Sequence, residues 1–118
     1  MDDEESPRIL FLDDDESRAA RFLKAHPDAV WVQTADECIR RLSEPWTVVH
    51  LDHDLGGEVF VDSSRTDCGM EVVRWLAGEQ AGPHLKDALI VVHTHNMNAA
   101  GGMVRTLREA GYETIYRP

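Results

Sequence analysis

Four short segments of the chain concentrate side chains that can do chemistry, and each of them directly follows an apolar run. They are Asp13-Asp14-Asp15, Asp52-His53-Asp54, His93-Thr94-His95-Asn96 and Arg117. Carboxylates side by side are unfavourable unless a cation or protons neutralise them. The clustering of carboxylates in the two acidic segments therefore needs a physical reason. A bound divalent metal ion that neutralises their charge is one such reason.

The acidic segments predict a metal site built from hard oxygen ligands. Magnesium is held by one or two carboxylates together with water and phosphate oxygens. The candidate ligands are Asp13, Asp14, Asp52 and Asp54. The alternative is that such acids cap helices or remain solvated in loops. This alternative is favoured for Asp15, because an acid at that position can cap the helix that follows.

The histidines add possible acid–base chemistry. Imidazole exchanges protons near neutral pH, and it also binds zinc, manganese or iron beside carboxylates. His53 and His93 lie at or just past predicted strand ends, and His95 follows two residues later. Alternate residues of a strand share a face, so His93 and His95 are expected to point the same way if the strand extends that far. His50, inside a predicted strand, is expected in the core or facing a helix.

Neutral and cationic groups complete the predicted site. Thr94 and Asn96 offer hydrogen bonds to phosphate oxygens or to an attacking water. Arg117 offers a planar guanidinium that can donate two parallel hydrogen bonds to a phosphate. The alternative for Arg117 is an ordinary surface arginine. Residues 56–67 form a loop that is unusually long for an α/β connection, so it is a candidate lid.

The apolar runs and helix signals predict the elements that must position these residues. Pro27, Pro45, Gly82-Pro83 and Gly111 mark helix ends, and Thr34-Ala35-Asp36-Glu37 is a capping box. The predicted strands cover 8–13, 29–33, 47–52, 88–94 and 113–116. The predicted helices cover 16–26, 34–45, 68–79 and 98–110.

Strands that alternate with helices predict an α/β fold with a doubly wound, five-stranded parallel sheet in the order 2-1-3-4-5. In this order a ligand binds beyond the carboxyl ends of strands 1 and 3. Neighbouring strands lie about 4.8 Å apart, so the four segments can share one ligand. We expect one domain over 8–118, preceded by an acidic tail over 1–7.

Composition limits the function classes. The 118 residues include 22 acidic and 12 basic ones, which gives a formal charge of −10. Such a surface repels polyanions, so broad nucleic-acid binding is not expected. No apolar stretch approaches the ~18 residues of a membrane span, and no signal peptide is recognised. Cys38 and Cys68 have no paired spacing and fit reduced thiols, so a cytoplasmic location is expected.

From residue 9 to residue 118 the chain resembles the receiver domain of two-component response regulators. Asp13-Asp14 matches the metal-binding acids of that family, and Asp52 in Val49-His50-Leu51-Asp52 matches its phosphoacceptor. Thr94 matches the Ser/Thr after strand 4, and Arg117-Pro118 stands where receivers carry Lys-Pro. The resemblance implies a flavodoxin-like receiver fold.

The chain departs from ordinary receivers at several points. Arg117 replaces lysine, His93 precedes Thr94 where an apolar residue is usual, and the sequence stops after the fifth strand, without the final receiver helix. The motif Asp52-His53-Asp54-Leu55-Gly56 with His93-Thr94-x-Asn96 is more similar to the cyclic-phosphate processing receiver domains. That branch was proposed from sequence to contain enzymes acting on cyclic or terminal phosphates, in RNA repair or nucleotide signalling.

Two function hypotheses follow from the residues and the resemblance. The first is a metal-dependent phosphoesterase that uses Mg²⁺, or Mn²⁺ or Zn²⁺ given the histidines, and acts on a small phosphorylated substrate or a nucleotide or RNA end. Its candidate catalytic residues are Asp52, His53, His93, Thr94, Asn96 and Arg117. The second is a stand-alone signalling module that a histidine kinase or a small phosphodonor phosphorylates on Asp52. A metal-binding or interaction domain with a vestigial pocket is a third option.

Overall fold

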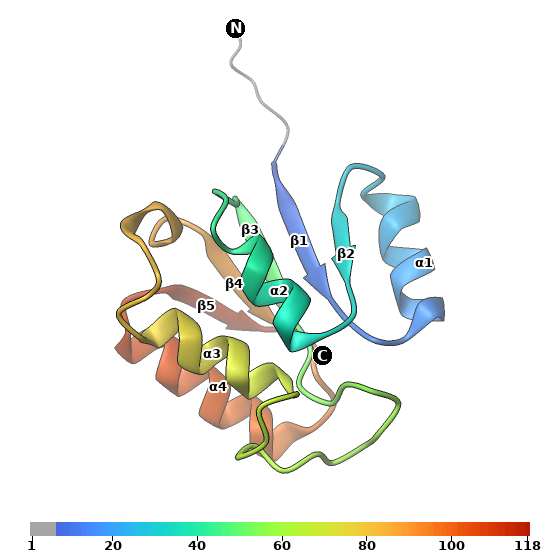
Figure 1. Cartoon of the computed structure of the whole chain (residues 1–118). Coiled ribbons are helices and arrows are strands. Elements are labelled where there is room, and N and C mark those ends of the chain that lie inside the picture. The colour runs from blue at the N-terminus through green and yellow to red at the C-terminus, as the bar shows by residue number, and fades with distance from the viewer. Residues whose placement is uncertain (1–6) are drawn as a thin grey trace, which may run out of the picture.

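The computed structural model describes residues 7–118 and shows a five-stranded, all-parallel sheet flanked by helices (Figure 1). The strands are β1 (Ile9–Leu12), β2 (Val30–Val32), β3 (Val48–Leu51), β4 (Leu89–Val92) and β5 (Glu113–Tyr116). The helices are α1 (Glu16–Ala25), α2 (Ala35–Arg41), α3 (Gly69–Ala77) and α4 (Met97–Glu109), with a 3₁₀ turn η1 (Pro83–Leu85). All but the last residue of the expected acidic tail lies outside the described residues.

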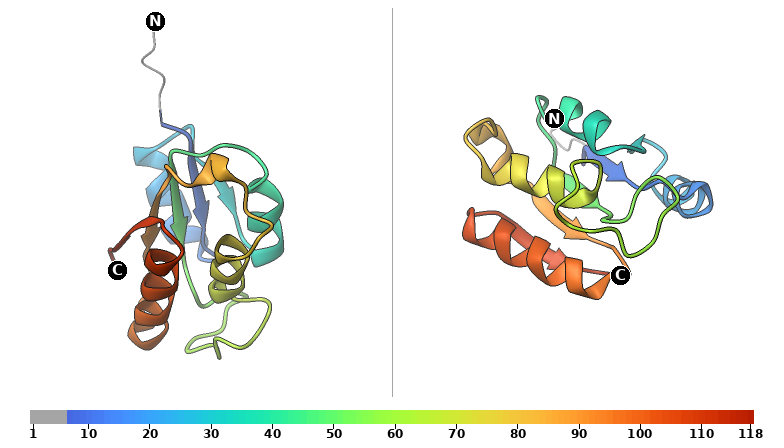
Figure 2. Two further views of the ribbon diagram at one scale, coloured as in Figure 1. Left: turned by 90° about the vertical axis from the view of Figure 1, so that its left-hand side faces the viewer. Right: turned by 60° about the horizontal axis from the view of Figure 1, so that its bottom comes forward.

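The sheet has the order β2-β1-β3-β4-β5, which confirms the predicted topology. Helix α1 lies on one face of the sheet, and α2 and α3 lie on the other (Figure 2). The main core is on the face of α2, α3 and α4, where strand side chains meet helix side chains: Leu10, Leu12, Val49, Leu51, Ile90 and Val92 with Val72, Leu76, Met103 and Leu107. On the opposite face Phe11 stacks on Phe22 of α1, with ring centroids 4.1 Å apart.

The strand register brings the predicted functional segments to one edge. Leu12 pairs with Leu51, Leu51 with Val92, and Val92 with Tyr116. The ladder continues for one more residue, because the backbone amides of Asp52, His93 and Arg117 donate to strand carbonyls at 3.1, 3.0 and 2.8 Å. The first residue after each of these strands therefore stands at the same level.

Helix caps behave as the sequence predicts. The Asp15 carboxylate begins α1 and accepts from the backbone amides of Ser17 and Arg18, at 2.8 and 3.1 Å. The Thr34 hydroxyl begins α2 and accepts from Glu37 N at 3.0 Å. The Glu37 carboxylate in turn accepts a hydrogen bond from the backbone amide of Gln33, also at 3.0 Å. These contacts satisfy amide groups that the first helical turn leaves without partners.

The structure departs from prediction at several element ends; the helix predicted over 34–45, for example, ends at Arg41. The strand expected to reach residue 94 ends at Val92, so the alternation rule does not apply to His93 and His95. Residues around Gly82-Pro83 were expected only as a helix breaker, but Pro83 begins a short 3₁₀ turn. Proline is tolerated there because the first residue of a helical turn has no amide bond to make.

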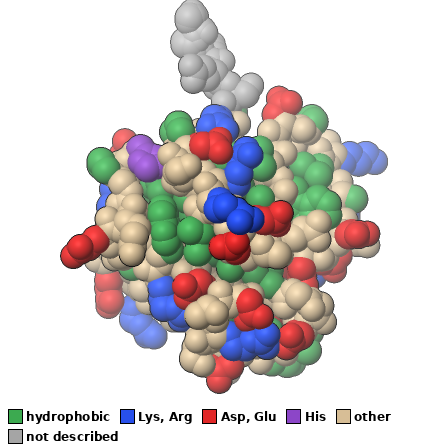
Figure 3. Space-filling model, in the orientation of Figure 1, with side chains coloured by type: hydrophobic (Ala, Val, Ile, Leu, Met, Phe, Trp, Pro, Cys, Tyr) green, Lys and Arg blue, Asp and Glu red, His purple; other side chains and the backbone are tan. Residues whose placement is uncertain are grey.

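Charged side chains of both signs cover the surface. On the face shown in Figure 3, the coloured acidic and basic residues are interspersed with hydrophobic ones and form no broad basic patch. Among the residues that the structure describes, no helix is long and apolar enough to cross a membrane.

Candidate functional site

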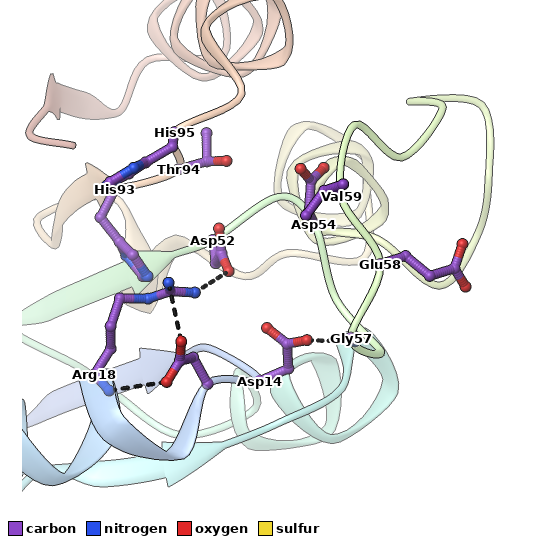
Figure 4. A pocket seen from close by; sticks show the side chains of 11 residues that line it. Asp14, Arg18, Asp52, Asp54, Gly57, Glu58, Val59, His93, Thr94 and His95 are labelled. Atoms are coloured by element: carbon purple, nitrogen blue, oxygen red, sulfur yellow. Dashed lines mark hydrogen bonds and ion pairs between the residues drawn. The ribbon is translucent and has the colours of Figure 1, made fainter.

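A cavity of about 400 Å³ opens at the sheet edge where β1, β3 and β4 end. Gly57, Glu58 and Val59 of the 55–67 loop form one wall, and the strand ends and the first turn of α1 form the rest (Figure 4). Acidic, imidazole and guanidinium groups line it: Asp14, Asp15, Arg18, Asp52, Asp54, His93 and His95. This location is the switch-point edge that the sheet order predicts.

Asp13 and Arg18 form the central ion pair of the site. Arg18 Nε lies 2.9 Å from Asp13 Oδ2, and Arg18 Nη2 lies 2.9 Å from Asp13 Oδ1, so the guanidinium binds the carboxylate with two parallel contacts. Arg18 Nη2 also lies 3.5 Å from Asp52 Oδ2. Figure 4 shows the guanidinium between Asp52 and the β1 end, beside His93.

The two strand-end carboxylates have opposite ionisation tendencies. Burial raises the pKa of Asp13, but hydrogen bonds from His93 and Arg18 outweigh it and hold this pKa well below its ordinary value. Burial raises the pKa of Asp52 to about 6, and its more distant contact with Arg18 offsets only part of that effect. Asp13 is therefore a firmly ionised anion, whereas Asp52 is the carboxylate with less compensation.

His93 is the histidine that reaches the acids. Its Nε2 lies 3.0 Å from Asp13 Oδ2, and its ring stacks on Phe11 with centroids 5.0 Å apart. Its Nδ1 is buried without a partner among the described residues. The Phe11 ring and the Asp13 hydrogen bond together fix the imidazole plane. The ring also lines the cavity, so it can meet a bound molecule.

Asp13, Asp52 and His93 fit a divalent cation. One ligand atom from each of these three residues lies within 4.8 Å of the others. Two hard carboxylate oxygens suit Mg²⁺ or Mn²⁺, and an imidazole nitrogen beside them extends the range to Zn²⁺. The residues present are thus compatible with a divalent cation, and the metal predicted for Asp13 and Asp52 stays a prediction.

Asp14 faces the cavity from its other side. Its Oδ2 accepts a hydrogen bond from Gly57 N at 2.6 Å, and Figure 4 shows the carboxylate turned toward that loop. Gly57 and its neighbour Gly56 have φ of 77° and 75°, which glycine adopts without a Cβ penalty. Asp14 thus links the β1 end to the loop, and its second oxygen remains available to a cation.

His53 and Asp54 point into the base of the loop. His53 is fully buried, with Nδ1 2.7 Å from Asp54 Oδ1 and Nε2 3.0 Å from Ser63 Oγ. Asp54 also accepts from the amides of Phe60 and Val61, at 2.8 and 3.1 Å. Both ring nitrogens of His53 and most of the lone pairs of Asp54 are already used. This geometry gives the two residues a loop-holding role, and Asp54 also lines the main cavity. The catalytic role of His53 and the metal-binding role of Asp54 stay predictions.

Thr94 and Asn96 shape the entrance to α4. Thr94 Oγ1 accepts from Asn96 N at 3.1 Å, which leaves the hydroxyl hydrogen free to donate into the cavity that Thr94 lines. Asn96 caps α4 by accepting from Ala99 N at 3.1 Å, and its side-chain amide donates to Asp54 at 3.2 Å. Asn96 lines a smaller neighbouring cavity, so the structure does not bring it into the main site.

Arg117 and His95 lie at the periphery. Arg117 is exposed and lines a groove of about 680 Å³ beside α1, which shares Arg18 and His93 with the main cavity. His95 is exposed and lines both spaces. The guanidinium next to the acids is that of Arg18, and the prediction from sequence missed it. An available signal was its place in the first turn of a helix, where a cation is disfavoured by the helix dipole unless acids surround it.

Comparisons with known proteins agree with this architecture. A family model described as the cyclic-phosphate processing receiver domain matches residues 8–109. Among solved structures, the chain is similar to the BeF3-activated DrrB receiver domain, with a TM-score of 0.59 and 19% sequence identity. That alignment covers 96% of this chain and 84% of the other, and it confirms the predicted receiver fold. No curated protein matches the chain.

Proposed function

The chain belongs to the cyclic-phosphate processing receiver domain family, and we propose that it is a divalent-metal-dependent phosphoesterase for cyclic or terminal phosphates of nucleotides or RNA ends. The observation that carries the proposal is His93, whose Nε2 lies 3.0 Å from Asp13 Oδ2 on the wall of the cavity. A phosphoacceptor pocket needs carboxylates but no imidazole. An imidazole held against an ionised carboxylate is an arrangement for proton transfer.

Asp13 and Asp52 would hold the cation, with Asp14 contributing from the opposite wall. Magnesium is the most suitable ion for two carboxylates, and it would polarise a phosphoryl oxygen and lower the pKa of a bound water. Asp13 is suited to this task because His93 and Arg18 keep its pKa well below the ordinary value, despite burial. It therefore presents a negative charge throughout the physiological pH range.

His93 would act as the general base through Nε2, once Asp13 binds the cation and this nitrogen is released from the carboxylate. It would then take a proton from the attacking water and would not itself be a metal ligand. Water oxygen bonds to phosphorus as the ring P–O bond of the cyclic phosphate breaks. The departing oxygen then takes a proton, which gives a hydroxyl and a phosphomonoester. His95 lines the same cavity and is the candidate donor for that proton.

Thr94 would orient the phosphoryl group. Its hydroxyl oxygen already accepts from Asn96 N, and its hydrogen would be donated to a phosphate oxygen. Arg117, on the adjoining groove, remains a candidate for contacts with the rest of the substrate. Asn96 would act indirectly, through its cap of α4 and its hydrogen bond to Asp54.

The direct test is hydrolysis of 2′,3′-cyclic nucleotides in the presence of Mg²⁺, Mn²⁺ or Zn²⁺. We expect His93→Ala to lower kcat by roughly 10²- to 10⁴-fold, the usual contribution of general acid–base catalysis. His26→Ala is a matched control, because His26 is an exposed histidine of the same sheet face, just after α1. Absence of turnover with all three metals, or full activity in the His93 variant, would contradict the proposal.

A second candidate function is a receiver signalling module phosphorylated on Asp52. Asp52 ends β3, is 3% exposed and lines the cavity together with Thr94, as a phosphoacceptor site requires. The similar solved structure is of a receiver domain activated by BeF3, a phosphoryl mimic. Incubation with acetyl phosphate and Mg²⁺ should then add one phosphoryl group that Asp52→Asn abolishes. An unchanged mass, with no beryllofluoride binding, would exclude this alternative.

A further inference from the structure

Arg18 contacts three carboxylates at once. Its guanidinium binds Asp13 through two contacts of 2.9 Å, and it lies 3.2 Å from Asp15 and 3.5 Å from Asp52. Hydrogen bonding to Asp13 raises the pKa of Arg18 further, so the side chain is always a cation here. The described acid set thus has an internal counter-ion.

This counter-ion uses the same oxygens that a metal ion needs. The metal-competent group consists of Asp13, Asp52 and His93, and Arg18 already contacts both of those carboxylates. A carboxylate oxygen that accepts from a guanidinium has fewer lone pairs to offer a second cation. Two neighbouring cations also repel one another, and this repulsion is strong where the surroundings are less polar than water.

We propose that Arg18 is an exchangeable counter-ion, which leaves the acid set when a divalent cation binds and then receives a phosphate oxygen of the substrate. The inference rests on the metal site of the proposed function and extends it. A guanidinium released from its carboxylates needs a new anionic partner, and its fork fits phosphate as well as carboxylate. Metal and phosphate should therefore strengthen one another's binding through this one side chain.

The surroundings of Arg18 allow the exchange. Its side chain is 39% exposed, so it can leave Asp13 and turn into the cavity without opening the core. The backbone need not follow, because Asp15 caps α1 through the amides of Ser17 and Arg18. A cation in the first turn of a helix is also disfavoured by the helix dipole, so the carboxylates are what hold it in place.

Arg21 supplies a matched control. It lies three residues further along α1, is exposed, and makes no side-chain hydrogen bond or ion pair with any residue from 7 to 118 in this structure. It lines the adjoining groove rather than the cavity. Arg21→Ala therefore removes the same charge from the same helix without removing a counter-ion from the acids.

The first experiment measures magnesium affinity by titration calorimetry on protein stripped with a chelator. Trp31 offers a second signal, because its Nε1 donates to the Asp13 carbonyl at 2.7 Å. We expect Arg18→Ala to bind Mg²⁺ about tenfold more tightly than the wild type, since a charged hydrogen bond contributes one to two powers of ten to such an equilibrium. Arg21→Ala should stay within about twofold of the wild type, because it removes no contact to the ligands.

The second experiment repeats the titration with inorganic phosphate present. Phosphate should strengthen Mg²⁺ binding in the wild type, and clearly less in Arg18→Ala, because the released guanidinium is then missing. Arg18→Lys keeps the charge but loses the fork, so its coupling should be intermediate. Arg18→Gln replaces the alanine variant if thermal unfolding shows that the latter does not fold.

Three results would overturn the inference: equal or weaker Mg²⁺ binding in Arg18→Ala, an equal gain in Arg21→Ala, or the same phosphate coupling in wild type and Arg18→Ala. The readouts are binding constants, so they are independent of turnover. A protein without hydrolytic activity that still shows the Arg18 effect would contradict only the phosphoesterase proposal. Failure of every variant to bind Mg²⁺ would overturn both proposals.

Discussion

Asp13 and Asp52 stand side by side at the ends of β1 and β3, but their surroundings affect their protons in opposite ways. Burial acts to raise the pKa of each carboxyl. Only Asp13 receives close side-chain hydrogen bonds, from His93 and Arg18, and these lower its pKa below the ordinary value. The pKa of Asp52, at about 6, lies above that of an unfolded aspartate. One carboxylate is thus fixed as an anion, and the other can change its charge near neutral pH.

The raised pKa of Asp52 gives a prediction about stability. The folded protein holds a proton on Asp52 more tightly than the unfolded chain, so this residue favours folding below about pH 4 and loses that effect as the pH rises through about 6. In metal-free protein, the stability of Asp52→Asn relative to the wild type should rise by about 2 kcal/mol from pH 4.5 to pH 8, because the wild type loses the contribution of the Asp52 proton over that range. Urea unfolding at both pH values measures the difference, and a constant difference would contradict the assignment.

Residue types at the site were predictable from sequence, and their partners were not. Strand-end acids identify Asp13 and Asp52 because a buried apolar run has no other reason to end in charge. The role of Arg18 was not predicted, because its contact with Asp13 depends on where α1 packs against the sheet, and local sequence patterns carry no such tertiary information. The partners of His53 were equally unpredictable, because its contacts with Asp54 and Ser63 depend on how the 55–67 loop folds over the strand end.

At the scale of elements, the 55–67 loop is tied to the site through Asp54. This carboxylate accepts from His53, Asn96 and the amides of Phe60 and Val61. Phe60 has φ of 54°, in the left-handed region, and its side chain is 79% exposed. A non-glycine residue in that conformation costs of order 1–3 kcal/mol, so the Asp54 contact must hold it there.

Asp54→Ala should therefore loosen the loop. We expect hydrogen exchange at the amides of Phe60 and Val61 to accelerate roughly tenfold or more, because each loses a charged acceptor. Asp62→Ala is the control: Asp62 also accepts from an amide of the loop, that of Ser64, but it is exposed and its carboxylate accepts from neither Phe60 nor Val61. Equal acceleration in both variants would show that Asp54 has no special part in holding the loop.

Helix α3 begins so close to β3 that only glycine fits at its first position. A Cβ on Gly69 would lie 1.9 Å from the carbonyl oxygen of Asp52. Gly69→Ala should displace that backbone and lower the free energy of unfolding by about 2 kcal/mol or more. Gly101→Ala, in open space inside α4, should instead raise it by about 0.5–1 kcal/mol.

Denaturant unfolding of the two variants checks the pair, and a stable Gly69→Ala protein would contradict the close approach.

The contact between Gly69 and Asp52 also shows what could not be predicted from the sequence. The apolar pattern of 68–79 predicts a helix there, but the pattern carries no information about how near its first residue comes to Asp52. Capping boxes and apolar runs are local signals, so the elements themselves were predicted well.

At the scale of the whole molecule, the sheet order gathers four loops at one edge, and a cation bound there would hold several of them together. A ligand that binds only the folded state stabilises it by about 2.7 kcal/mol at a hundredfold excess over Kd. Saturating Mg²⁺ should therefore raise Tm by several degrees, and a chelator should reverse the gain. Asp13→Asn combined with Asp52→Asn should show no shift, whereas an unchanged shift would place the metal elsewhere.

The division of the cavity between strand ends and loop has a consequence for how specificity can evolve. Asp13, Asp52 and His93 belong to the ladder of the sheet, whereas the opposite wall is a single loop attached through Asp14 and Asp54. The side chains proposed to react and the loop that encloses them thus belong to separate parts of the chain. We expect chimaeras that exchange residues 56–62 between relatives to alter which molecules are accepted while the reacting groups stay in register.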